Sequence, residues 1–299
     1  MFHQYKSSRI VIIGIFLILM QTLTGSSFDA ITKFLSSSNF MWYHYYAIGN
    51  LFPIVISLMY LLIIGRIKKN IFFYNKKNYI LPLLRGITFI PVPIIIYYIL
   101  ERIPISIFTP ILMTTPFFIY IWSNILQKEK IILRYWIILI VGFSGTLFVA
   151  KPSFFESNPL VFIIFLIAAY NALTNVLVSK YASSATPYGF TFYNVLPLTI
   201  VCFILFILDP IYLNTREVIL ICLGGCFLFI AILLWTMAFQ IAAKFTRVIT
   251  PFFYSQLIWA SFFGIIFFNE SLDYLSIVGL LLIVFSGTLT ILNVSKTIK

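Results

Sequence analysis

Ten apolar runs, each close to the length of a membrane-crossing helix, take up most of this 299-residue chain. A helix needs about 20 mainly apolar residues to cross a bilayer. Only 9% of the residues are charged, whereas soluble domains carry about 25%. The sequence therefore predicts an all-α integral membrane protein with ten transmembrane helices. The runs are approximately 10–32, 42–64, 80–99, 104–126, 134–150, 159–182, 188–208, 218–241, 246–268 and 274–293.

The net charge of +12 follows the predicted loops. With a cytoplasmic N-terminus, fifteen basic residues fall on the cytoplasmic side and four on the other, as the positive-inside rule requires. Ten crossings then place both termini in the cytoplasm. Topology accounts for the excess of positive charge, so no nucleic-acid partner is expected. The four outer residues are Lys33, Arg102, Lys151 and Arg216.

The two halves of the chain match each other at an offset of 141 to 144 residues. In each half a Thr-Pro pair opens an apolar run, and an acid lies 19 residues after the proline, from Pro110 to Glu129 and from Pro251 to Glu270. Three further blocks match in the same order. We therefore expect two repeats, 1–151 and 152–299. The matching blocks begin at Asp29 and Asn171, at Asn50 and Asn194, and at Phe143 and Phe285.

Each repeat holds five predicted spans, an odd number, so the second repeat must cross the membrane in the opposite sense to the first. Inverted repeats are the architecture of many secondary transporters, in which the substrate site lies near the bilayer midplane. Two similar halves can exchange conformations and open a central site to either side in turn. The sequence thus predicts alternating access.

Ionisable residues within the spans are few, and each has two readings. Asp29 and Lys33 lie four residues apart on one helix face. They could form a structural ion pair, or they could take part in transport or its coupling to an ion. Arg85 could extend to the headgroups or attract an anionic substrate within a cavity. His44, in the aromatic run 42–46, could couple transport to protons; the aromatic belt of membrane interfaces favours anchoring.

Polar residues in the fourth and ninth runs are candidates for a substrate site. Ser255, Gln256 and Trp259 fall within one helical arc of about 100°. The repeat places Thr114 and Thr115 opposite the first two, and polar pairs at matching depth should meet near the midplane. Polar contacts between helices are the alternative. Secondary candidates for the same cavity are Asn171, Asn175 and Asn194.

The chain contains the strings Asp29–Lys33, Leu84-Arg85-Gly86, Pro104 to Glu129, Gly142–Gly145, Ala168–Ala172, Pro251–Ala260, Asn269-Glu270 and Gly279. Together these strings resemble the drug/metabolite transporter superfamily of EamA type. The resemblance covers nearly the whole chain and extends to a branch of bacterial inner-membrane permeases that includes S-adenosylmethionine and riboflavin transporters. It implies a central cavity and a bacterial inner-membrane location. One departure is that many relatives carry an arginine early in the second span, where this chain has His44.

The leading hypothesis is a carrier for a small metabolite, with Arg85, Tyr254, Gln256 and Trp259 in its cavity. Aromatic walls suit a flat heterocycle such as S-adenosylmethionine or riboflavin. An amino-acid or drug exporter of the same fold is the alternative. An intramembrane transferase is a distant third, because such chemistry needs clustered acids or an acid–base pair. We expect no catalytic residue, cofactor or metal, and a monomer or homodimer in the lipid bilayer.

Overall fold

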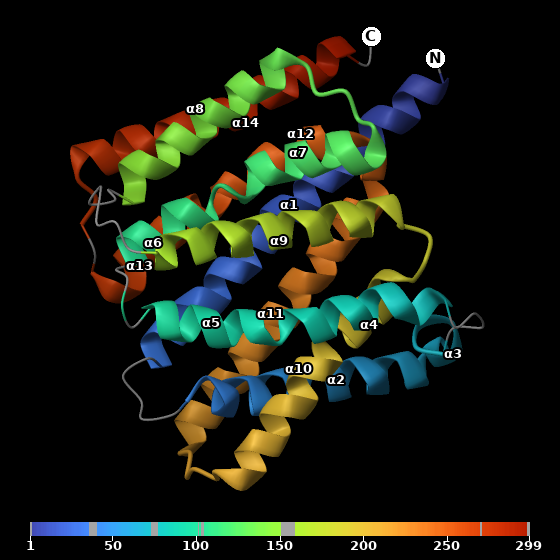
Figure 1. The fold of residues 1–299 in the computed structure, drawn as a ribbon, viewed down its shortest axis with the longest axis vertical. Coiled ribbons are helices and arrows are strands. Elements are labelled where there is room, and N and C mark those ends of the chain that lie inside the picture. The colour runs from blue at the N-terminus through green and yellow to red at the C-terminus, as the bar shows by residue number, and fades with distance from the viewer. Residues whose placement is uncertain are drawn as a thin grey trace. The chain divides into compact units, whose positions relative to one another are not determined.

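The computed structural model describes residues 2–35, 41–72, 77–100, 102, 105–150, 159–269 and 271–297, and these form helices joined by short turns, with no strand among them (Figure 1). The first-half helices are α1 (Phe2–Leu35), α2 (Trp42–Ile63), α3 (Ile67–Asn70), α4 (Lys77–Phe89), α5 (Pro91–Leu100), α6 (Ile105–Leu112), α7 (Thr115–Gln127) and α8 (Leu133–Ala150). The second-half helices are α9 (Leu160–Lys180), α10 (Pro187–Leu208), α11 (Thr215–Ile241), η1 (Ala243–Phe245), α12 (Thr246–Ile249), η2 (Thr250–Tyr254), α13 (Ser255–Phe268) and α14 (Tyr274–Thr297).

Eight helical stretches in the described part of the chain are long and apolar enough to cross a membrane. Large apolar side chains on them are exposed, such as Ile63 (82%) and Leu208 (75%), as expected for surfaces in contact with lipid. An all-α, multi-pass membrane protein is therefore confirmed. The predicted runs 104–126 and 134–150 are covered by the shorter helices α6, α7 and α8, and ten crossings stay a prediction.

Contacts within the chain form two compact units, each with segments from both predicted repeats. The first unit comprises Met1–Leu23, Tyr98–Ala182 and Met237–Lys299, and the second comprises Thr24–Tyr97 and Ser183–Thr236. This grouping reflects packing alone, so the repeat boundary at residues 151 and 152 stays a prediction.

In the first unit, α8 lies along α14 (Figure 1). The two backbones approach closely at a pair of glycines: a Cβ on Gly145 would lie 2.6 Å from the carbonyl oxygen of Gly279, and a Cβ on Gly279 the same distance from that of Gly145. The Ser286 hydroxyl donates to the Ile138 carbonyl at 2.8 Å. Small residues of this kind let membrane helices pack backbone to backbone.

The other main contact of the first unit joins α7 to α9. Trp122 Nε1 donates to the carbonyl of Ala169 at 3.1 Å, and Gln127 Nε2 donates to that of Val176 at 3.3 Å. Both side chains therefore act as interhelical hydrogen-bond donors, which are favourable inside an apolar layer.

Helices are interrupted at matching places in the two halves of the chain. The fourth run breaks at Met113 and Thr114 before α7 begins, and the ninth passes through η2 before α13 begins. Both helices then end on a left-handed residue, Lys128 (φ 56°) and Asn269 (φ 53°). These two residues are 141 positions apart, an offset found in the matched sequence blocks.

In the second unit, α10 packs against both α2 and α4. Helix α10 begins where the Thr186 hydroxyl accepts the Gly189 N–H at 3.2 Å, a standard N-terminal cap. On α4, a Cβ at Gly86 would lie 2.6 Å from the carbonyl oxygen of Asn194. Because glycine has no side chain, α4 can lie against the α10 backbone. This contact positions Arg85, the residue before Gly86.

Candidate functional site

Arg85 is an ionisable residue inside an apolar span. It lies on α4 within the membrane-length stretch Asn78–Ile96, seven residues from the start of that stretch, or about 10 Å at 1.5 Å per residue. Its side chain is half-buried. Because Gly86 allows α4 to touch α10, the guanidinium is held against that helix.

Three uncharged side chains surround the Arg85 guanidinium within the second unit. Nη1 donates to Asn194 Oδ1 at 2.5 Å. The guanidinium carbon lies 4.3 Å from the ring centroid of Trp235 and 5.7 Å from that of Phe89. Asn194 and Trp235 are only 5% and 6% exposed. A cation over an aromatic face gains up to about 2 kcal/mol when water is excluded.

We call this group the Arg85 cluster (Arg85, Phe89, Asn194 and Trp235), and none of these three partners of Arg85 carries a negative charge. A guanidinium presents five N–H donors in a planar fork that matches a carboxylate. The cluster can therefore attract an anionic group, and Trp235 offers a flat surface beside it.

The sequence supplied two members of this cluster as separate candidates, Arg85 and Asn194, and the structure brings them together. Sequence reasoning missed Trp235 and Phe89. Both lie in apolar runs of a chain with 33 Phe, 18 Tyr and 5 Trp residues, so no pattern distinguishes them from lipid-facing aromatics.

Two predicted site residues of the ninth run, Ser255 of the arc and the neighbouring Tyr254, serve in packing within the first unit. The Ser255 hydroxyl donates to the Phe252 carbonyl at 2.7 Å and lies 2.8 Å from Thr22 Oγ1 on α1. Tyr254 is fully buried, and a Cβ on Gly142 of α8 would lie 2.6 Å from its ring. These contacts agree with the alternative of polar and aromatic packing between helices.

The remaining members of that arc, Gln256 and Trp259, are half-buried on α13. Trp259 Nε1 is buried with no hydrogen-bond partner among the described residues. Thr114 and Thr115 lie at the break before α7, where their hydroxyls donate to the carbonyls of Ile111 and Leu112, both at 2.6 Å. The two threonines thus satisfy carbonyls that the break exposes.

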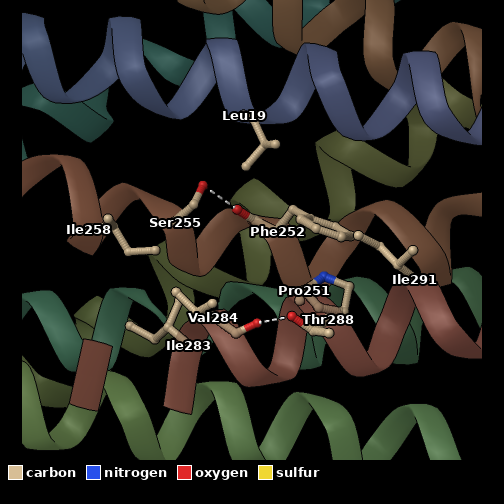
Figure 2. A pocket seen from close by; sticks show the side chains of 10 residues that line it. Leu19, Pro251, Phe252, Ser255, Ile258, Ile283, Val284, Thr288 and Ile291 are labelled. Atoms are coloured by element: carbon tan, nitrogen blue, oxygen red, sulfur yellow. Dashed lines mark hydrogen bonds between the residues drawn. The ribbon is translucent and has the colours of Figure 1, made fainter. Parts of the chain in front are cut away.

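A pocket of about 190 Å³ lies in the first unit among α1, η2, α13 and α14. Figure 2 shows its largely apolar walls, with Leu19 on α1, Pro251 in η2 and Ile291 on α14. Ser255 is the predicted site residue that lines it, and its hydroxyl is bonded to Phe252 (Figure 2). This apolar pocket and the Arg85 cluster belong to different units.

His44 fastens the start of α2 to the end of α10 in the second unit. Its Nδ1 accepts the Met41 N–H at 3.0 Å, so Nε2 carries the ring hydrogen and donates to the Asp209 carbonyl at 2.7 Å. The imidazole is 3% exposed, and Tyr43 also donates to the Asp209 carboxylate. With both nitrogens engaged in backbone contacts, the geometry favours the anchoring role.

The other candidates are spread over both units. Asp29 and Lys33 are exposed near the end of α1 in the second unit, and Asn171 is half-buried on α9 in the first. Arg85 belongs to the second unit, whereas Gln256 and Trp259 belong to the first, so a cavity shared by the three stays a prediction.

Comparison with known proteins gives a fold but no function. No protein-family model and no curated protein sequence matches the chain. Among solved structures, 27 chains match. One is a crystal structure described only as that of a protein, with 15% sequence identity and a TM-score of 0.73 over 97% of this chain and 99% of the other. At this level of identity the likeness concerns the fold alone.

Proposed function

We propose that this protein is a secondary transporter that carries a small metabolite across the membrane by alternating access. The observation that carries the proposal is the Arg85 cluster, in which a cation inside an apolar span rests on Trp235 and Asn194. Ionisable groups inside spans are costly, and they mark substrate or ion pathways by default.

The cluster favours a substrate with a flat ring and an anionic or carboxylate group. The ring would stack on Trp235 and the anionic group would pair with the Arg85 guanidinium. S-adenosylmethionine and riboflavin fit the first requirement, and S-adenosylmethionine and the aromatic amino acids carry a carboxylate. An amino-acid or drug exporter of the same fold is the alternative function.

Two further features support our proposal that the protein has ten spans arranged as inverted repeats of EamA type. The broken helices and the left-handed residues Lys128 and Asn269 recur at the repeat offset, and α8 packs on α14 at the Gly145–Gly279 pair. We propose that both termini are cytoplasmic and that the protein lies in a bacterial inner membrane, in keeping with the distribution of basic residues.

Flux into vesicles tests the function. Purified protein is reconstituted and supplied with labelled S-adenosylmethionine, riboflavin, phenylalanine or tryptophan, and each is assayed with and without a pH gradient. We expect saturable flux of at least one compound. Arg85→Gln should lower that flux about tenfold or more, the loss expected when a hydrogen bond to a charged group is removed.

The matched control is Arg134→Gln. Arg134 is an exposed arginine on α8 that donates to Asn293 at 3.0 Å, outside the Arg85 cluster, so this variant should retain native flux. Flux of one compound that is equal in Arg85→Gln and the native protein would remove Arg85 from the site. Absence of flux for all four compounds would count against the proposed substrate class.

A further inference from the structure

Glu129 is a buried acid that the proposed substrate site does not use. It follows α7, where left-handed Lys128 turns the chain and the Glu129 N–H donates to the Ser123 carbonyl at 3.3 Å. The turn directs the carboxylate back towards the protein, and its side chain is only 8% exposed. An acid enclosed to this degree at the end of a membrane helix needs a specific partner.

That partner is Arg247 on α12, which lies beside α7 in the first unit (Figure 1). Arg247 Nη1 donates to Glu129 Oε1 at 3.2 Å and to the Lys130 carbonyl at 3.4 Å. In addition, the Tyr120 hydroxyl of α7 donates to the Arg247 carbonyl at 2.6 Å. These bonds tie the end of the fourth run to the start of the ninth, and the two runs occupy matching places in the proposed repeats.

The second carboxylate oxygen, Glu129 Oε2, is buried with no hydrogen-bond partner among the described residues. Burial raises the pKa of Glu129 above its ordinary value, and Arg247 opposes this shift through its charge and a backbone hydrogen bond. Other groups around the pair are the phenols of Tyr120 and Tyr135, which belong to one core cluster, and the exposed Lys128 and Lys130.

We propose that Glu129 is a proton-binding site that couples transport to protons, with the proton bound while α7 is closed onto α12 and released when these two ends separate. This inference rests on the proposed carrier function. In the closed arrangement the carboxyl group is enclosed and its Oε2 atom has no donor among the described residues, so a proton is bound more tightly there than in water. Once separated from α12, the carboxyl group gains water and its charged form is favoured.

The sign of the pH effect follows from linkage. A proton that binds more tightly to the closed arrangement stabilises that arrangement at low pH, and the stabilisation is lost as the pH rises through the raised pKa of Glu129. Raising the pH should therefore separate α7 from α12, and lowering it should bring them together. Glu129→Gln, which resembles the protonated acid, should stay closed at every pH.

Distances between spin labels test this directly. Labels are placed at Lys130→Cys and Lys244→Cys, two exposed positions that flank the ion pair, after Cys202, Cys222 and Cys226 are replaced by serine. The protein is held in lipid nanodiscs over a pH series. We expect a short distance at acid pH, a longer one at alkaline pH, and only the short distance in Glu129→Gln.

Arg247→Gln provides a second, quantitative check. It removes the cation that favours ionised Glu129, so the midpoint of the transition should move upward by about one to three pH units. The matched control is Glu217→Gln, an acid of the second unit whose carboxylate accepts the Asn214 N–H at the start of α11, and it should keep the native midpoint. If Glu129→Gln fails to fold, the pH dependence of the distance in the native protein and the shift of its midpoint in Arg247→Gln still test the proposal.

A distance that does not change with pH, one that lengthens at acid pH, or a native pH response in Glu129→Gln would each overturn the proposal. Because this measurement uses no substrate, it is independent of the flux assay. Flux without a pH-dependent distance would leave the carrier standing and remove Glu129 as its coupling site. A pH-dependent distance without flux would leave the proton site standing and count against the carrier.

Discussion

At the scale of single residues, a proline on one helix and a tyrosine on another form a complementary pair. Pro251 has no N–H, so the carbonyl of Arg247 four residues earlier loses its usual helical donor. The hydroxyl of Tyr120, a fully buried residue on α7, donates to that carbonyl instead. A carbonyl that proline leaves unpaired in an apolar layer is tolerable only when the surrounding protein satisfies it.

We predict that Tyr120→Phe lowers the free energy of unfolding by about 1–3 kcal/mol, because the buried Arg247 carbonyl is then left without a donor. In a Pro251→Ala background the same change should cost less, since the alanine N–H can donate to that carbonyl. Unfolding of the four proteins in detergent would form a double-mutant cycle. Equal losses in the two backgrounds would contradict this account.

At the scale of helices, α8 and α14 of the first unit pack backbone to backbone. The reciprocal contact of Gly145 and Gly279, with each absent Cβ 2.6 Å from the opposite carbonyl oxygen, leaves no room for any side chain. Without a hydrophobic driving force between membrane helices, such backbone packing supplies much of their attraction. The two glycines therefore set the separation of these helices.

Gly145→Ala and Gly279→Ala should each destabilise the protein by roughly 1–3 kcal/mol, the usual cost of overpacking, because backbone rather than a mobile side chain must move. Gly287→Ala on the same helix is the control, since its Cβ would lie 3.4 Å from the Phe252 ring, an ordinary contact. Thermal unfolding in detergent measures all three. A control as unstable as Gly145→Ala would show that any alanine on this face is harmful.

At the scale of the whole molecule, the number of crossings decides on which side each loop lies. In the part of the chain that the structure describes, eight stretches satisfy the length and composition of a span, while α6, α7 and α8 are shorter. If α6 with α7 makes one crossing and α8 another, Lys130 faces the cytoplasm and Arg216 faces the opposite side. Both side chains are exposed, so both are accessible to reagents.

Cysteine labelling in intact cells tests this topology. In a background without the native cysteines, we expect Arg216→Cys to react with a membrane-impermeant maleimide and Lys130→Cys to react only after the cells are opened, because basic loops stay in the cytoplasm. Labelling of both positions from outside would be incompatible with ten crossings and cytoplasmic termini.

Apolar run length sufficed to predict the helices, because the cost of exposing backbone N–H and C=O groups to lipid leaves few alternatives. It did not predict where helices break. The runs 104–126 and 246–268 were expected as continuous spans, but the first breaks at Met113 and Thr114 and the second contains η2. The position of a break depends on hydrogen-bond partners from other helices, such as Tyr120.

The candidate site was accessible to sequence reasoning only where charge or polarity stood out. Arg85 and Asn194 were recognisable as polar residues in apolar runs, whereas Trp235 was one aromatic among many. The helical arc of Ser255 and Gln256 was identified, but not what it would contact. Thr22 belongs to another run, and only tertiary packing shows that its hydroxyl lies beside that of Ser255.

The lengths of the helices after the two breaks also indicate how far inside the membrane the breaks lie. Helix α7 has 13 residues and α13 has 14, so each is about 20 Å long, shorter than a hydrocarbon layer of about 30 Å. If each run crosses the bilayer, both breaks lie about 10 Å inside the hydrocarbon, one entered from each face. The hydroxyls of Thr114, Thr115 and Tyr120 then satisfy backbone carbonyls well inside the hydrocarbon, where no water is present to do so.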